Sequence, residues 1–150
     1  MKYSEIKHYK YKLEENEEIQ TGITGYLFCN RHMMMWENGL LLIKKSYAWD
    51  GSSIPHKGLI RVLSLWQYDG DRYCKVASLI HDALCQAMRE GNLPKGEKFH
   101  ADCLYAKLCE QGGLSKWRAT KRFQALRKFG DSGIEPEKNP RNKIYDTERK

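Results

Sequence analysis

The chain has 150 residues, of which 41% are hydrophobic and 30% charged, and its formal net charge at pH 7 is +7. This length is enough for one domain with a hydrophobic core. No run of residues approaches the roughly 20 apolar residues that cross a bilayer, and the polar N-terminal segment lacks the apolar stretch of a signal peptide. Five cysteines without a CxxC pair favour reduced, buried thiols over a disulfide scaffold.

The first third of the sequence is typical of β-structure. Asn38-Gly39, placed between apolar runs, is a strong signal for a hairpin turn. The run of three methionines at 33–35 is more typical of a buried strand than of a ligand surface. We therefore predict strands over residues 8–13 and 17–28 and a two-stranded hairpin within 30–49.

A loop and then a run of helices follow the predicted strands. The segment DGSSIPHKG, residues 50–58, interrupts the strand pattern with turn-forming residues and predicts an ordered loop. A short helix is expected over 59–68. Apolar residues then recur every three or four positions from Val76 to Met88, which predicts a helix within 71–91 that ends at Gly91.

Two further helices are predicted within 97–113 and 116–130. The short connection between 71–91 and 97–113 favours an antiparallel helix hairpin. The last helix is expected to bury an apolar stripe made of Trp117, Phe123, Leu126 and Phe129. The fold class is therefore α+β, with an N-terminal antiparallel β-sheet followed by a three-helix C-terminal part. We expect one domain over 1–130 and a polar C-terminal tail over 131–150.

A His-Asp pair lies in the middle of the first long helix, in SLIHDALC. Neighbouring residues on a helix do not face each other, so His81 and Asp82 are suited to separate tasks. At about 1.5 Å of rise per residue, His81 and Asp102 differ by only about 6 Å along the expected hairpin. Asp102 could therefore orient His81, and His81 could act as a general base.

The remaining candidates would hold a cation and position the substrate. Asp82, with Asp50 from the loop after the strands, provides the oxygen ligands that Ca²⁺ or Mg²⁺ prefers, and Ser53 would position bound groups. A zinc site is less favoured, with His81 and Cys85 as one pair and His100 and Cys103 as the other. His32 and His100 are otherwise expected at the surface or at an edge.

Several stretches together resemble a family of short phage and prophage proteins that carries domain of unknown function 1353. The family pattern is Asp-Gly-Ala/Ser-Ser-Ile-Pro, then His-Asp-x-x-Tyr, then Ala-Asp-x-x-Phe, and a closing helix that ends near Phe-Gly. Cys85 stands where the family usually has Tyr, and Tyr105 where it often has Phe. The resemblance implies a phage origin and brings no reaction. It rests on WDGSSIP (49–55), ASLIHDALC (77–85), HADCLYAKLCEQGGLSKWRA (100–119) and FQALRKFG (123–130).

Two enzyme families share fragments of this pattern. Phospholipases A2 place His-Asp-x-x-Tyr on one helix and an Asp on its antiparallel partner; there the His activates water, its neighbour binds calcium and the distant Asp orients the His. His81, Asp82 and Asp102 match in order, but the glycine-rich calcium loop is absent. Metal-dependent His-Asp phosphohydrolases need an earlier helical His, for which His56 is the only candidate, and their fold is all-helical.

These observations leave three functions open. The first is a phage-encoded accessory protein that acts as a metal-assisted hydrolase. The second is a non-enzymatic virion, tail or assembly component that contacts other phage structural proteins and in which the same residues are structural. The third is nucleic-acid binding through the basic surface of the helix over 116–128. The expected location is the host cytoplasm or the virion.

Overall fold

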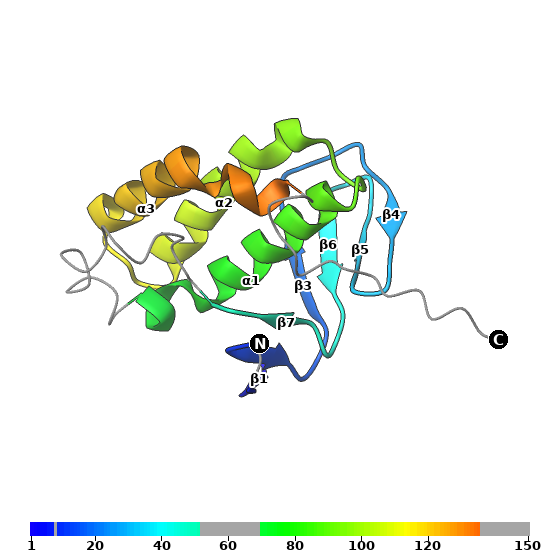
Figure 1. Ribbon diagram of the computed structural model, residues 1–150, viewed down its shortest axis with the longest axis horizontal. Helices are drawn as coiled ribbons and strands as arrows, with labels where there is room; N and C mark the ends of the chain where they lie inside the picture. Colours follow the sequence, from blue (N-terminus) through cyan, green and yellow to red (C-terminus); the bar gives the residue numbers. More distant parts are fainter. Residues whose placement is uncertain (8, 52–69, 136–150) are drawn as a thin grey trace.

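The computed structural model describes residues 1–7, 9–51 and 70–135 of the chain (Figure 1). Antiparallel strands occupy the N-terminal part and three α-helices follow, which confirms the α+β prediction. The strands are β1 (Tyr3–Glu5), β2 (Tyr11–Leu13), β3 (Glu17–Gln20), β4 (Phe28–Cys29), β5 (Met33–Met35), β6 (Leu40–Ile43) and β7 (Ala48–Trp49). The helices are α1 (Gly70–Arg89), α2 (Lys98–Gln111) and α3 (Lys116–Phe129), with 3-10 turns η2 (Lys95–Glu97) and η3 (Gly130–Ile134).

The strands form two small sheets rather than one. The order is β1-β2-β7 in the first sheet and β3-β6-β5-β4 in the second. A tight turn after β6, in which Ser46 has a φ of 74° and the Tyr47 amide donates to the Lys44 carbonyl, redirects the chain. As a result β7 pairs with β2, with Tyr11 opposite Trp49, instead of extending the sheet that contains β6.

The predicted hairpin is β5–β6. Gly39 has a φ of 82°, the left-handed conformation that this turn requires and that glycine adopts without strain. Met33 and Met35 are fully buried, as are Leu41 and Ile43 opposite them. The methionine run is therefore a buried strand, as the sequence indicated.

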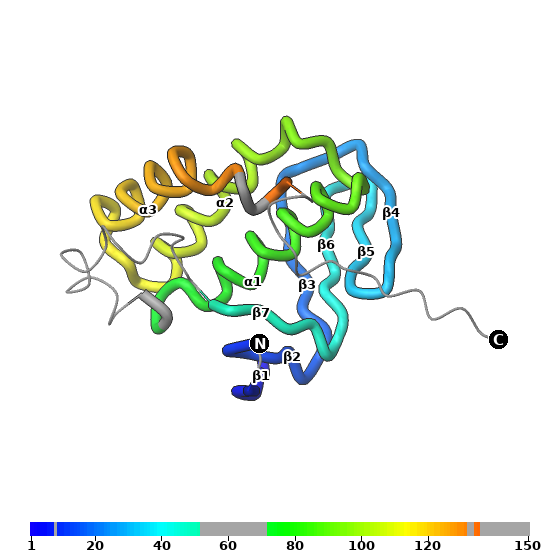
Figure 2. Tube along the Cα trace, viewed as in Figure 1, coloured from blue at the N-terminus to red at the C-terminus, as the bar shows by residue number. Residues whose placement is uncertain are grey.

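The central element of the molecule is α1, which lies between the strands and the other two helices (Figures 1 and 2). Between residues 76 and 88 its only Asp, Glu, Lys, Arg or His side chains are His81 and Asp82, so it can be buried on most of its surface. On one side Trp49 of β7 donates its indole N–H to Ser78 at 3.2 Å. On the other side α1 packs against α2.

The helices α1 and α2 run antiparallel, because Tyr73 near the start of α1 lies against Gly112 after the end of α2, while His81 meets Asp102 near their centres. No helix in the parts of the chain described here is long and apolar enough to cross a membrane.

The apolar stripe expected on α3 is buried only in part: Phe123 and Leu126 are partly buried, and Leu126 packs against the cluster that contains Ala119. Trp117 and Phe129 are 56% and 37% exposed, and Ala119 is the buried residue of this helix among those described. Among the described elements, α3 packs against α2 and η3. After α3, Ile134 of η3 is buried in the main core, so packed structure continues beyond residue 130. The expected helix over 59–68 and residues 136–150 of the tail lie outside the described residues.

Candidate functional site

The antiparallel pairing of α1 and α2 places His81 against Asp102, as the helix spacing predicted. The Nε2 atom of His81 lies 2.7 Å from Oδ1 of Asp102. Asp102 is fully buried and His81 is 7% exposed. Since a carboxylate accepts hydrogen bonds only, Nε2 carries the hydrogen and donates it. The proton at Nδ1 is then the one that can be exchanged.

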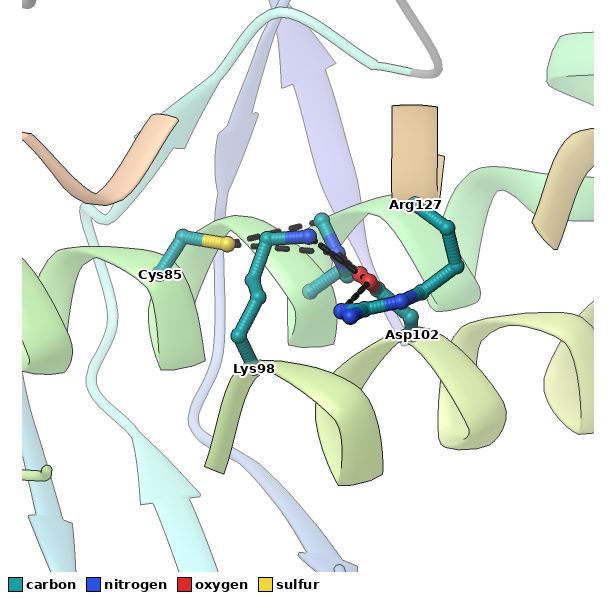
Figure 3. Close-up of polar contacts among 5 residues, drawn as sticks. Cys85, Lys98, Asp102 and Arg127 are labelled. Atoms are coloured by element: carbon teal, nitrogen blue, oxygen red, sulfur yellow. Dashed lines mark hydrogen bonds and ion pairs between the residues drawn. The ribbon is translucent and has the colours of Figure 1, made fainter. Parts of the chain in front are cut away.

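Two further cations bind the same carboxylate. Nζ of Lys98 lies 2.6 Å and 2.8 Å from the two oxygens of Asp102, and a terminal nitrogen of Arg127 lies 3.2 Å from Oδ2. Figure 3 shows the Lys98 and Arg127 side chains pointing toward Asp102 from either side. His81 belongs to α1, Lys98 and Asp102 to α2, and Arg127 to α3, so one buried carboxylate joins three helices.

The sequence interpretation missed both of these partners. Lys98 precedes Asp102 by four residues on one helix, a spacing that brings opposite charges together, so the pair could have been recognised. Lys98 is itself only 3% exposed. Arg127 is 25 residues from Asp102, and no local pattern links the two. Its place depends on how α3 packs against α2.

The charge on Asp102 is stabilised by its neighbours. Burial raises the pKa of this carboxyl, but hydrogen bonds from His81 and Lys98 and their positive charges outweigh burial, so that the pKa lies below its usual value of 3.8. Asp102 is therefore ionised at neutral pH. Because all three partners are donors, it can polarise His81 but is not a free ligand for a metal ion.

The charge on His81 follows from the same surroundings. Burial lowers its pKa, but the charge of Cys85, the hydrogen bond to Asp102 and the charge of Asp82 act in the opposite direction and raise the pKa of His81 to about 10. The resting side chain is therefore an imidazolium at neutral pH. This changes the expected chemistry, because His81 gives up a proton before it can accept one.

A thiol lies beside the imidazole of His81, at similar distances from both ring nitrogens. Sγ of Cys85, one helical turn further along α1, lies 3.7 Å from Nδ1 and 3.9 Å from Nε2. Tyr105 of α2 packs its ring edge-to-face against the imidazole, with centroids 5.4 Å apart. The ring is thus held by a carboxylate at one nitrogen, with a thiol and an aromatic side chain beside it.

The proposed cation ligands lie at different places around this centre. Asp82 follows His81 on α1, is partly exposed, and is near enough to act on the pKa of both His81 and the buried Tyr47. Asp50 is also partly exposed and comes directly after β7. Ser53 lies outside the described residues. The structure therefore joins His81 and Asp102 directly and places Asp82 beside them.

The four residues of the zinc interpretation lie in different surroundings. His81 and Cys85 are buried, whereas Cys103 is exposed and the side chain of His100 is 64% exposed and bonded to Glu97 at 2.6 Å. The described residues contain no group of three or more His, Cys, Asp or Glu side chains placed to hold a metal ion. His100 is a surface residue, as expected.

Comparison of the chain with protein-family models, with curated proteins and with solved structures found no match. The resemblance to the phage family and the likeness to phospholipases A2 stay predictions from the sequence.

Proposed function

We propose that the chain is a phage-encoded accessory protein that acts as a hydrolase, with His81 and Asp102 as its proton-transfer pair. The observation that supports this most is the 2.7 Å hydrogen bond between His81 and Asp102 within the buried interface of α1 and α2. A carboxylate on one ring nitrogen fixes the orientation of the imidazole and stabilises its charged form. The other ring nitrogen is then available for the reacting proton.

The order of proton transfers follows from the charge of His81. As an imidazolium, His81 gives its Nδ1 proton to the leaving group as water attacks the substrate, and the neutral imidazole then takes up the proton that the added water releases. Asp102 stays ionised throughout because Lys98 and Arg127 also bind it. A Ca²⁺ or Mg²⁺ ion bound by Asp82 and Asp50 would polarise the substrate, with Ser53 positioning it.

The test compares two histidines that each bind a carboxylate. The purified chain and the variants His81→Asn, Asp102→Asn and His100→Asn are assayed on chromogenic carboxylic ester, phosphoester and peptide substrates, with EDTA, Ca²⁺, Mg²⁺ or Zn²⁺. We expect turnover that falls about 10²- to 10⁴-fold in the first two variants. His100→Asn, which changes the exposed pair with Glu97, should keep the wild-type rate.

Two results would contradict the proposal. The first is equal turnover in His81→Asn and His100→Asn. The second is a wild-type chain that hydrolyses no substrate under any of these conditions, combined with a lower melting temperature in His81→Asn. The second result would favour the non-enzymatic component, in which the charges around Asp102 fasten the helices together.

Nucleic-acid binding is a second candidate because of one feature of α3. Trp117 is 56% exposed, and Nζ of Lys121 lies 5.9 Å from the centre of its ring. An exposed aromatic ring among basic side chains can stack on an unpaired base. If this surface binds single-stranded DNA or RNA, affinity should fall steeply with salt and should fall further in Trp117→Ala. Binding that is independent of salt, or unchanged in this variant, would exclude it.

A further inference from the structure

In the part of the chain that the structure describes, Cys85 is a nucleophilic side chain that contacts the proton-transfer pair. Its sulfur lies 3.7 Å from Nδ1 and 3.9 Å from Nε2 of His81, and Nε2 is bonded to Asp102 at 2.7 Å. In Figure 3 the Cys85 side chain points from α1 toward the cluster around Asp102. The thiol, the imidazole and the carboxylate therefore form a continuous series, which is the arrangement that activates a cysteine nucleophile.

The other four cysteines lack this environment. Cys29 and Cys103 are exposed, and Cys29 lies 3.6 Å from the amine of Lys44. Cys74 and Cys109 are buried together and hydrogen-bond to each other. Among the contacts of the described residues, Cys85 is the cysteine whose sulfur contacts a histidine that is itself bonded to a carboxylate.

Resting on the proposed function, we propose that Cys85 is the nucleophile of this hydrolase and that its substrates are acyl compounds, namely carboxylic esters or thioesters. Thiolates attack acyl carbonyl carbons, and the resulting acyl-thioester is readily hydrolysed. The thiolate is the nucleophilic form of a cysteine side chain, and a neighbouring imidazolium is a group that favours this form in general. In this scheme the nucleophile of the first step is a side chain, and water enters only in the second step.

Each step balances. Sγ of Cys85 bonds to the carbonyl carbon of the ester, and the bond between that carbon and the alcohol oxygen breaks as the oxygen takes the Nδ1 proton of His81. Water then attacks the thioester and gives a proton to the neutral His81. The carbon–sulfur bond breaks, which releases the carboxylic acid and restores the thiolate–imidazolium pair. Asp102 holds the ring throughout and does not take up a proton.

The first measurement is alkylation of the native protein with iodoacetamide, a small neutral reagent, followed by mass spectrometry of each cysteine peptide. We expect alkylation of Cys85 to slow by about a hundredfold in His81→Asn, near the lower end of what a general base contributes. Cys103, which is exposed on α2, is the internal control and should react equally in both proteins. A Cys85 that reacts no faster in the wild type than in His81→Asn would overturn the assignment.

The second measurement separates this inference from the proposed function. With p-nitrophenyl acetate, acid quenching should trap one acetyl group on Cys85 in the wild type, and Cys85→Ala should lose turnover whereas Cys103→Ala should not. If Cys85→Ala keeps turnover that His81→Asn loses, the hydrolase proposal stands and Cys85 is not its nucleophile. If neither the wild type nor any variant hydrolyses esters, thioesters or the other test substrates, both proposals fail.

Discussion

Asp102 is a buried carboxylate whose two oxygens accept hydrogen bonds from three cationic side chains. A buried charge is costly unless its partners are close and well oriented, and here the bonds to His81, Lys98 and Arg127 are 2.6 to 3.2 Å long. The charge of Lys98 also requires a close partner, because this side chain is buried as well and Asp102 is the acceptor for its amine. Removing either charge leaves the other without compensation.

We therefore expect Asp102→Asn to destabilise the fold by about 3–5 kcal/mol, the range for removing one partner of a buried ion pair. Urea unfolding followed by circular dichroism would measure this. Glu135→Gln is the matched control, because Glu135 pairs with Lys95 at 3.0 Å where both side chains are largely exposed, and it should cost less than about 1 kcal/mol. Equal costs in the two variants would contradict a buried ion pair at Asp102.

For single residues, the sequence predicts a contact when both partners lie on regular, adjacent elements. His81 and Asp102 could be paired because each position along its helix was readable from the apolar spacing and the connection was short. Arg127 could not be assigned, since the packing of α3 on α2 is decided by contacts spread over many residues. The charge of His81 also escaped prediction, because it depends on Cys85, Asp102 and Asp82 together.

Among the elements, α1 and α2 are held very close at one end. A Cβ atom built on Gly112, just after α2, would lie 2.0 Å from the backbone oxygen of Tyr73 in α1. Backbone atoms cannot move aside as a flexible side chain can. Only a residue without a side chain fits here. This contact therefore sets how α1 aligns with α2, the two helices that carry His81 and Asp102.

Gly112→Ala should therefore destabilise the protein by about 1–3 kcal/mol, as overpacking of a tight contact does, and should weaken the alignment of α1 with α2. Gly96→Ala is the control, since a Cβ atom there meets nothing within 4 Å and the change should lie within about 0.5 kcal/mol. Thermal and urea unfolding of both variants would check this. A Gly112→Ala variant as stable as Gly96→Ala would show that the two helices can separate without cost.

The helix α3 shows that helical periodicity predicts a helix but does not predict how much of it is buried. Its apolar residues recur at helical spacing, which correctly predicted a helix. The same spacing was read as a buried stripe, but burial also needs a partner element, and Trp117 stays 56% exposed. The hairpin β5–β6 was more predictable, because the turn chemistry of Asn38-Gly39 is local and the pattern on both sides agreed with it.

For the whole molecule, the charges of the site make stability depend on pH in a defined direction. The pKa of His81 rises from 6.5 to about 10 on folding, so its contribution is fully present below pH 6.5 and is lost as the pH rises toward 10. The pKa of Asp102 is lowered, so its contribution is lost in acid. The titratable or charged groups around His81 are Asp82 and Cys85 on α1, Lys98, Asp102 and Tyr105 on α2, and Arg127 on α3.

We expect the free energy of unfolding to fall between pH 6.5 and pH 10, and to fall less steeply in His81→Asn, which has no imidazole to titrate. Urea unfolding at intervals across this range, for the wild type and the variant, measures the two slopes. His100→Asn should keep the wild-type slope, because its ring is largely exposed. Parallel curves for all three proteins would show that folding leaves the pKa of His81 unchanged.

For the fold as a whole, the order of strands before helices could be predicted from the sequence, whereas the division into two sheets could not. It depends on the turn at Ser46 and on the long-range pairing of β7 with β2. Pairings between segments far apart in the chain have no signature in local spacing.

The position of Cys85 one turn after His81 means that half of the candidate site exists before the tertiary structure does. Any stretch of helix that includes both residues brings the thiol near the imidazole, since residues four apart share a face. The carboxylate arrives only when α2 docks on α1. In a chain in which α2 has not yet docked, or in an isolated α1 peptide, the thiol would therefore lie near the imidazole, but no carboxylate would polarise the ring. Reactivity at Cys85 thus becomes a reporter of the docking step itself.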